Sequence, residues 1–255
     1  MANKPLILIT NDDSISAKGI LSLVEAMKPL GDILVVAPDK PQSGMGHAIT
    51  IHDPLRLVKS NQFNGVEAYT CSGTPVDCVK LAIYEVLKTR PTLLVSGINH
   101  GSNAATNVLY SGTMSAAVEG AIEGIPSIGF SLLDYAADAD FSASIEYASK
   151  IAAGVLKNNL QSGACLNVNI PKGKPNEIQG LKICRQGKCF WEDSFDKRKD
   201  PFGGEYFWLT GKIESTDKGQ DTDMWALDNN FVSVVPTQFD MTAHHLISTL
   251  NEWKF

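Results

Sequence analysis

The sequence has few of the features that place a protein in a membrane or stabilise it covalently. None of its apolar runs approaches the roughly 20 residues that a transmembrane helix needs. The first residues lack the apolar core and the cleavage site of a secretory signal peptide. The five cysteines are an odd number without a C-x-x-C pair, which argues against a disulfide framework and against zinc-site spacing. We therefore expect a cytoplasmic protein that does not bind membranes.

Positive charge is also scarce. The 255 residues contain 22 Lys and Arg against 28 Asp and Glu, which gives a net charge of -6. Because nucleic acids are bound mainly through Lys and Arg, this balance argues against a nucleic-acid polymer as the main partner. A hydrophobic content of 44% is ordinary for a globular protein, and the chain is long enough to bury a large core in one domain.

Three common catalytic motifs are missing. The chain has no G-x-x-x-x-G-K-[ST] sequence, which excludes a P-loop ATPase, and no G-x-S-x-G elbow, which excludes the usual α/β-hydrolase. Gly44-Met45-Gly46 continues to Ile49, where a dinucleotide-binding fingerprint needs a third small residue. An aspartyl-phosphate phosphatase would have Asp-x-Asp after its first strand, whereas Asp12 and Asp13 are adjacent.

Residues 1–171 alternate between continuous apolar runs and helical patterns, which is typical of an α/β core. The apolar runs predict strands at 7–10, 33–38, 92–97, 127–133 and 165–170, and alternation predicts further strands within 47–71 around an Asp53-Pro54 turn. Helices are expected at 17–30, 74–87, 111–124 and 141–157. Strands of this kind form a largely parallel sheet that is covered by helices on both faces.

The C-terminal part has a different texture. Residues 172–230 are richer in charged and aromatic residues that alternate, so we expect one or more projecting β-hairpins, whose aromatics are typical of an oligomer contact. Residues 231–255 predict a strand at 232–235 that returns to the body and a final helix at 241–250. The core at 1–171 and the extension together form a single domain.

Oxygen-bearing side chains follow the ends of three predicted strands. Asp12 and Asp13 follow the first strand, Ser43 lies in the glycine-rich loop after the second, and Asn99 follows the third. Ligands of open α/β sheets bind beyond the carboxyl ends of the strands, so we expect these four residues to converge. Each residue alone is compatible with an ordinary turn or helix cap. Together, their hard oxygen donors favour one Mg²⁺ or Mn²⁺ ion, with Ca²⁺ as an alternative.

A candidate phosphate site accompanies the metal site. Ser111, Gly112 and Thr113 stand where the helix of 111–124 begins, and a helix N-terminus attracts phosphate through its free N–H groups and its dipole. Asn103 is close enough in sequence to Asn99 to contribute a side-chain amide. An ordinary Ser/Thr cap would explain Ser111 equally well.

Several ordered motifs resemble the SurE family, the survival-protein nucleotidases. The resemblance rests on Thr10-Asn11-Asp12-Asp13, Ala37-Pro38-Asp39 with Ser43-Gly44, Gly73 to Val79, Ser96 to Gly101, Tyr110 to Thr113, Asn167 to Pro171, and Thr222-Asp223. It implies a three-layer α/β/α sandwich with a Rossmann-like sheet and a C-terminal β extension used to form dimers or tetramers. It also implies that Asp12, Asp13, Ser43 and Asn99 are the metal ligands. Ser14 stands where the resemblance implies a glycine, and Ala104-Ala105 lies in a loop that is often richer in glycine in the family.

The hypothesis is metal-assisted hydrolysis of a phosphomonoester. The resemblance implies nucleoside 5′-monophosphates as substrates and, in some members, 3′-nucleotides or polyphosphate. Asp12 and Asp13 are the predicted catalytic residues, because they hold the metal and one of them can orient the attacking water. The group that protonates the leaving oxygen stays open, with His47 and His100 as candidates. The alternative is a nucleotide- or phosphate-binding module with a structural metal and no turnover.

Overall fold

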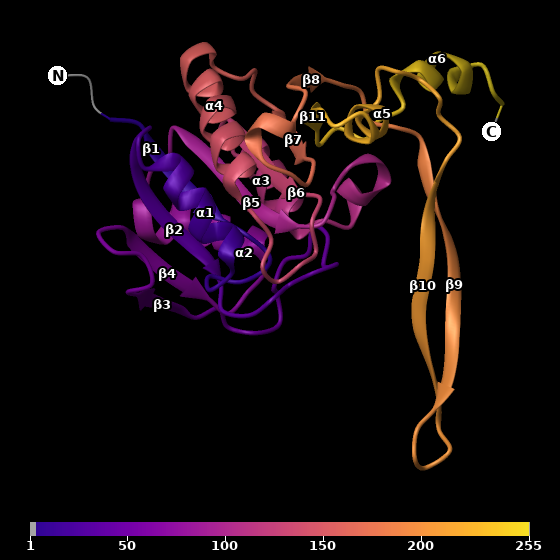
Figure 1. The fold of residues 1–255 in the computed structure, drawn as a ribbon, viewed down its shortest axis with the longest axis horizontal. Helices are drawn as coiled ribbons and strands as arrows, with labels where there is room; N and C mark the ends of the chain where they lie inside the picture. Colours follow the sequence, from indigo (N-terminus) through magenta and orange to yellow (C-terminus); the bar gives the residue numbers. More distant parts are fainter. Residues whose placement is uncertain (1–3, 255) are drawn as a thin grey trace.

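The computed structural model describes residues 4–254, most of which form a body with helices on both faces of a nine-stranded sheet (Figure 1). The strands are β1 (Leu6–Thr10), β2 (Asp32–Pro38), β3 (Leu57–Ser60), β4 (Glu67–Cys71), β5 (Leu93–His100), β6 (Ser127–Leu132), β7 (Ala164–Ile170), β8 (Leu181–Ile183), β9 (Cys189–Lys199), β10 (Glu205–Ser215) and β11 (Val232–Gln238). The α-helices are α1 (Lys18–Met27), α2 (Pro75–Leu81), α3 (Gly112–Ile122), α4 (Ser142–Asn158), α5 (Asp223–Asp228) and α6 (His244–Asn251). Short helical turns are η1 (Ala82–Leu87), η2 (Ala105–Leu109) and η3 (Pro175–Glu177).

The main sheet has the strand order β3-β4-β2-β1-β5-β6-β7-β11-β8. The consecutive pairs from β4 to β7 are parallel, whereas β3 runs antiparallel to β4 and β11 antiparallel to β7. The predicted largely parallel, three-layer fold is therefore confirmed. The chain order reverses at β1, which has β2 on one side and β5 on the other. Such a switch point opens a crevice at the carboxyl ends of its strands, and a ligand site is expected there.

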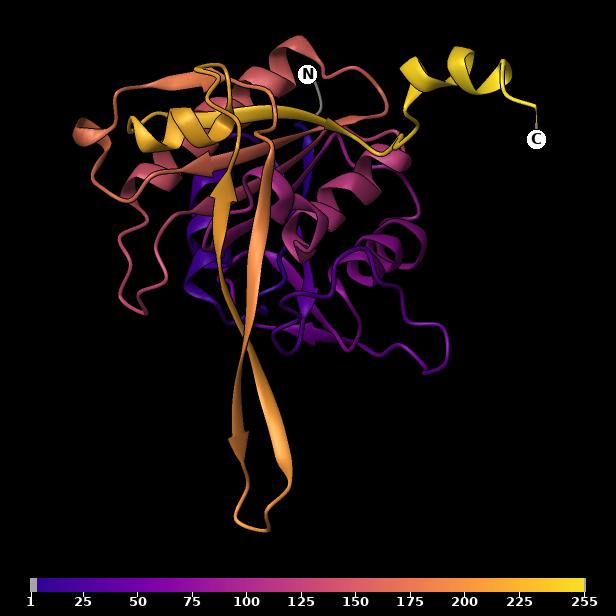
Figure 2. The same cartoon turned by 90° about the vertical axis from the view of Figure 1, so that its right-hand side faces the viewer.

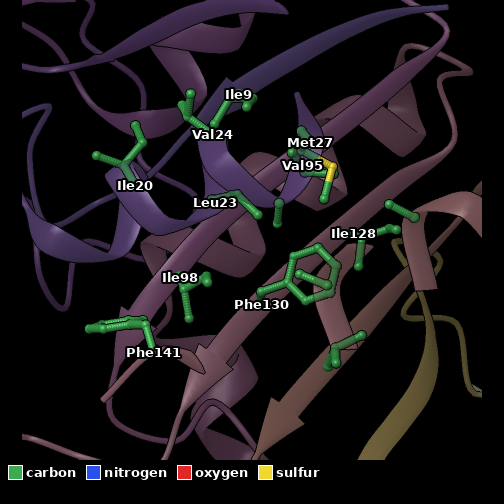
Figure 3. Packing of buried hydrophobic residues seen from close by; sticks show 14 of the residues in the cluster. Ile9, Ile20, Leu23, Val24, Met27, Val95, Ile98, Ile128, Phe130 and Phe141 are labelled. Carbon is green, nitrogen blue, oxygen red and sulfur yellow. The ribbon is translucent and has the colours of Figure 1, made fainter. Parts of the chain in front are cut away.

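The apolar runs are buried on both faces because the sheet lies between two helical layers. Ile7 and Ile9 of β1 join the core beneath α1 and α4, and Leu8 between them joins the core beneath α2. Figure 3 shows α1 side chains, including Leu23, close to Phe130 of β6. These residues are 0% exposed, and each buried side chain of this size stabilises the fold by about 1.5–3 kcal/mol.

Local sequence signals determine where α2 begins and how closely α3 packs on the sheet. Thr74 caps α2 with Pro75 at its first position, and Asp77 completes a capping box. The helix predicted at 74–87 is confirmed as α2 followed by η1, whose bonding is of the π type. In α3, small residues allow close packing on the sheet: a Cβ on Gly120 would lie 2.2 Å from Oγ of Ser127.

Two details of the core differ from the expectation. Residues 47–56 form no strand, and the chain turn lies at 61–66 between β3 and β4 instead of at Asp53-Pro54. The third predicted strand continues to His100, so Asn99 lies within β5 and not after its end. The register between β5 and β6 shifts between Ser96 and Asn99, which changes the direction of the strand at that point.

The projecting part of the C-terminal segment is the β9–β10 hairpin, which extends far beyond the body (Figure 2). Within 172–230, β8 instead pairs with β11 in the main sheet, and α5 packs against β11. The predicted returning strand and final helix correspond to β11 and α6, and α6 has no buried residue. All five cysteines are buried free thiols. Between residues 4 and 254, no helix has the length and apolarity to cross a bilayer.

Candidate metal and phosphate site

The two adjacent acids lie immediately after β1, at the switch point of the sheet. Asp12 is 4% exposed and Asp13 is partly buried. The side chain of Asn11 donates a hydrogen bond of 2.7 Å to the carbonyl of Ser14, and the amide of Ile15 donates to the carbonyl of Pro38 at 2.9 Å. These bonds hold the loop in one conformation, so both carboxylates are presented at the carboxyl edge.

Both acids are disfavoured in their ionised forms. Burial and, second, the charge of Asp13 together raise the pKa of Asp12 from 3.8 to about 6, and this shift includes the opposing effect of the hydroxyl of Thr113, which donates a hydrogen bond. Burial also raises the pKa of Asp13, and the backbone N–H of His100, 3.3 Å from its Oδ2, partly offsets this. A pair of this kind is stabilised by a cation.

The loop that carries Ser43 is held against this pair. The amide of Gln42 donates to the carbonyl of Asp12 at 2.8 Å, which places Ser43 beside the acids. Further along the loop, Nε2 of His47 lies 2.9 Å from the carboxylate of Glu119 on α3. Glu119 is 3% exposed, so a buried charge on the helix fixes the far end of the loop.

Asn99 lines the same cleft as Asp12 and Asp13, and its side-chain oxygen is a candidate metal ligand there. Its side-chain nitrogen donates to the carbonyl of Gly101 at 2.9 Å and to that of His100 at 3.3 Å. Because the nitrogen is engaged in this way, the side-chain oxygen is left for a ligand. The cleft is lined by all four predicted metal ligands: Asp12, Asp13, Ser43 and Asn99.

The N-terminus of α3 lies against Asp12. The hydroxyl of Ser111 accepts a hydrogen bond of 3.0 Å from the amide of Met114 and therefore caps the helix. A Cβ on Gly112 would lie 2.7 Å from Cβ of Asp12, so glycine permits this close approach. Thr113 is fully buried and donates its hydroxyl proton to Asp12. Of the three predicted phosphate-binding residues here, only Ser111 lines the cleft.

Asn103 lines the cleft as predicted, but its side chain is also part of a buried network. Its side-chain nitrogen donates to Oγ of Ser131, and its backbone amide donates to Oδ1 of Asn169, both at 2.8 Å. Asn167 donates to the Asn103 carbonyl at 2.8 Å. Asn167 and Asn169 alternate along β7 and so share one face, which is the pattern that could have indicated their common role.

The two histidine candidates differ in position. His100 lines the cleft, where its Nδ1 lies 3.2 Å from the carbonyl oxygen of Asp134 and its ring packs edge-on against Phe141. His47 is paired with Glu119 and is absent from the cleft lining.

The cleft has a volume of about 940 Å³ and one wall that was not predicted. Residues of the projecting hairpin form this wall: Trp191, Asp193, Leu209, Thr210 and Gly211. The alternation of charged and aromatic residues in 172–230 predicts an oligomer contact but not this place in the cleft. Within residues 4–254, no three His, Cys, Asp or Glu side chains form a cluster that could hold a metal. A cation here would depend on two carboxylates with a hydroxyl and an amide oxygen.

A mainly parallel α/β sandwich with paired acids at its switch point defines a ligand-binding α/β protein. The profile of the family described as "Survival protein SurE" matches residues 7–193, and the chain belongs to this family. It is 61% identical to "5'-nucleotidase SurE" of Flavobacterium psychrophilum, over 98% of both chains, and 59% identical to that of Flavobacterium johnsoniae, over 98% of this chain and 97% of the relative. The crystal structure of the SurE protein from Aquifex aeolicus superimposes with a TM-score of 0.84 at 38% identity, covering 97% of this chain and 98% of that one.

Proposed function

We propose that this protein is a divalent-metal-dependent 5′-nucleotidase, which hydrolyses nucleoside 5′-monophosphates to nucleoside and phosphate. The observation that carries the proposal is the convergence of Asp12, Asp13, Ser43 and Asn99 on one cleft at the switch point of the sheet. The proposal is also supported by the similarity of the chain, over nearly its full length, to proteins named 5′-nucleotidases. Hydrolysis of 3′-nucleotides and polyphosphate is part of the same hypothesis.

The donor set fits one Mg²⁺ or Mn²⁺ ion, with Ca²⁺ as the alternative, because all four ligands offer hard oxygen atoms. Asp12 and Asp13 supply two negative charges that balance a divalent cation, and such a cation would favour their ionised forms against the burial that raises their pKa values. When bound, the ion neutralises phosphate charge and lowers the pKa of water.

The remaining side chains hold Asp12 in place and bind the phosphate of the substrate. Thr113 holds Asp12 in place through its hydroxyl and is therefore a positioning residue. Asn103 and the capped start of α3 at Ser111 and Gly112 face the phosphate, since the first N–H groups of a helix attract anions. One carboxylate of the Asp12–Asp13 pair orients the attacking water. The buried network beneath Asn103 keeps this arrangement rigid before substrate arrives.

The C-terminal extension is proposed to join subunits into a homodimer or homotetramer. The hairpin and α6 expose large apolar side chains, including Phe207 at 55% and Ile247 at 47%. Exposed apolar surface of this kind is typical of interaction sites. Light scattering coupled to gel filtration tests this, and a monomer at micromolar concentration would contradict it.

The decisive experiment measures phosphate release from nucleoside 5′-monophosphates with Mn²⁺ or Mg²⁺, with and without a chelator. The proposal predicts release that the chelator abolishes and that added metal restores. The alternative, a binding module with a structural metal, predicts saturable nucleotide binding without release. A panel that includes 3′-nucleotides and polyphosphate then defines the substrate range.

A further inference from the structure

The cleft is much larger than a phosphate group needs. Its volume of about 940 Å³ lies at the upper end of pockets that enclose a whole small molecule, about 300–1,000 Å³. The acids and Ser111 at the start of α3 are part of its lining, and the β9–β10 hairpin contributes five further residues. The hairpin therefore offers surface to the part of the substrate that lies beyond the phosphate.

The register of the hairpin shows which of its faces forms the wall. Trp191 pairs with Ile213, Asp193 with Gly211, and Phe195 with Leu209. Partners directly opposite in an antiparallel pair share a face, and every second residue along a strand does so too. Four of the five hairpin residues in the cleft therefore lie on one face: Trp191, Asp193, Leu209 and Gly211.

This wall is fixed to the body by the turn η2. Nε1 of Trp191 donates to Oδ1 of Asn107 at 2.8 Å, and the hydroxyl of Thr106 donates to the carbonyl of Cys189 at 2.7 Å. The fully buried carboxylate of Asp223 accepts from the amides of Ala105 and Gly187, both at 2.8 Å. The indole of Trp191 thus has a defined position at the base of the hairpin, where little ordering remains to be done on binding.

The chemistry of the wall matches a nucleoside. Trp191 is 40% exposed, which leaves ring surface on which a flat base can stack. Asp193 is a carboxylate, which repels a phosphate but accepts hydrogen bonds from sugar hydroxyls. Gly211 opposite Asp193 has no side chain, and a Cβ there would lie 2.7 Å from the backbone oxygen of Glu192.

We propose that the cleft-facing side of the β9–β10 hairpin is the nucleoside subsite, with Trp191 stacking on the base and Asp193 accepting hydrogen bonds from the ribose. This inference rests on the proposed phosphatase function and deepens it. It makes the hairpin the element that distinguishes a nucleotide from any other phosphomonoester.

The test compares kcat/KM for adenosine 5′-monophosphate and ribose 5-phosphate, which carries a hydroxyl in place of the base. Wild type should prefer the nucleotide, and Trp191→Ala should reduce this preference about 5- to 150-fold while hydrolysis of ribose 5-phosphate stays close to wild type. Trp191→Phe keeps an aromatic ring but loses the hydrogen bond to Asn107. It should retain most of the preference.

The matched control is Trp208→Ala, because Trp208 is 59% exposed, lies on the other face of the hairpin and does not line the cleft. Trp208→Ala should leave the ratio of kcat/KM for adenosine 5′-monophosphate to that for ribose 5-phosphate unchanged. Equal wild-type activity on both substrates, or equal losses in Trp191→Ala and Trp191→Phe, would overturn the subsite while leaving the phosphatase intact. Failure of the wild type to release phosphate from either substrate would refute the proposed function, and the subsite with it.

Discussion

Replacing Asp12 by Asn separates what the carboxylate does for activity from what it does to stability. The substitution keeps the shape of the side chain and an oxygen that can accept the hydrogen bond from Thr113, but it removes the charge. If Asp12 is a metal ligand, phosphate release should fall to background. The metal-free protein, in contrast, should become more stable.

The size of this stabilisation follows from burial. Asp12 is 4% exposed, and the folded protein raises its pKa from 3.8 to about 6. One pKa unit corresponds to about 1.4 kcal/mol, so at neutral pH the ionised group lowers the free energy of unfolding by up to about 3 kcal/mol. For a chain of this length, that is a rise of about 5–10 °C in Tm on substitution.

The stability of the metal-free protein should depend on pH in one direction. The folded state holds the proton more tightly than the unfolded state, so wild type gains stability as the pH falls from above 6 towards 3.8. The advantage of Asp12→Asn in metal-free buffer should therefore be full at pH 7.5 and disappear near pH 4. Calorimetry or thermal shift measurements at several pH values follow this directly, with Asp53→Asn in an exposed loop as the control.

Addition of Mn²⁺ should reverse the order of stability at pH 7.5, because the ion stabilises the charged pair in wild type and not in the variant. A metal-free Asp12→Asn protein that melts below wild type at pH 7.5 would refute the reasoning from burial. Substantial remaining activity would refute the ligand role separately.

Two further substitutions test contacts that hold the site residues in place. Gly112→Ala brings a Cβ within 2.7 Å of Asp12, so we expect at least about tenfold lower kcat and about 1–3 kcal/mol lower stability; wild-type kinetics would contradict the close approach. Glu119→Ala removes the carboxylate that pairs with both His47 in the Ser43 loop and Lys80 of α2, and should lower stability by about 1–3 kcal/mol in urea denaturation and raise KM. An unchanged KM would show that this anchor does not act on the site.

The fold was predictable because its signals are local. Continuous apolar runs such as Ile33–Pro38 are buried on both faces only in a covered parallel sheet, and Thr74-Pro75 starts a helix by its own chemistry. The convergence of Asp12 and Ser43 followed from one geometric rule about strand ends, whereas Asn99 reaches the cleft from within β5. No knowledge of side-chain contacts was needed for it.

Rules of this kind do not predict the side-chain hydrogen bonds that support the site. Thr113 binds Asp12 across 101 residues, and Trp191 binds Asn107 across 84. No spacing within one element indicates pairs of this kind, so the sequence predicts a phosphate contact for Thr113 but not its hydrogen bond to Asp12. The alternation in 172–230 predicted the hairpin but could not place its base beside the cleft.

Two residues of the site loops other than glycine have a left-handed backbone conformation. Ser14 has a φ of 87° and Ala105 a φ of 51°, both in the left-handed region that favours glycine. Ser14 is held there by its contact with Asn11, and Ala105 by its hydrogen bond to Asp223. These loops therefore keep their conformation at the expense of about 1–2 kcal/mol of backbone strain at each position.

The central claim is that one divalent cation is held by oxygen atoms gathered at the end of β1. Anomalous diffraction from a crystal grown with Mn²⁺ measures this most directly. We expect a single peak per subunit, in contact with carboxylate oxygens of Asp12 and Asp13 and within coordination distance of Ser43 and Asn99. A peak elsewhere, or none at this edge of the sheet when the ion is in excess, would contradict it.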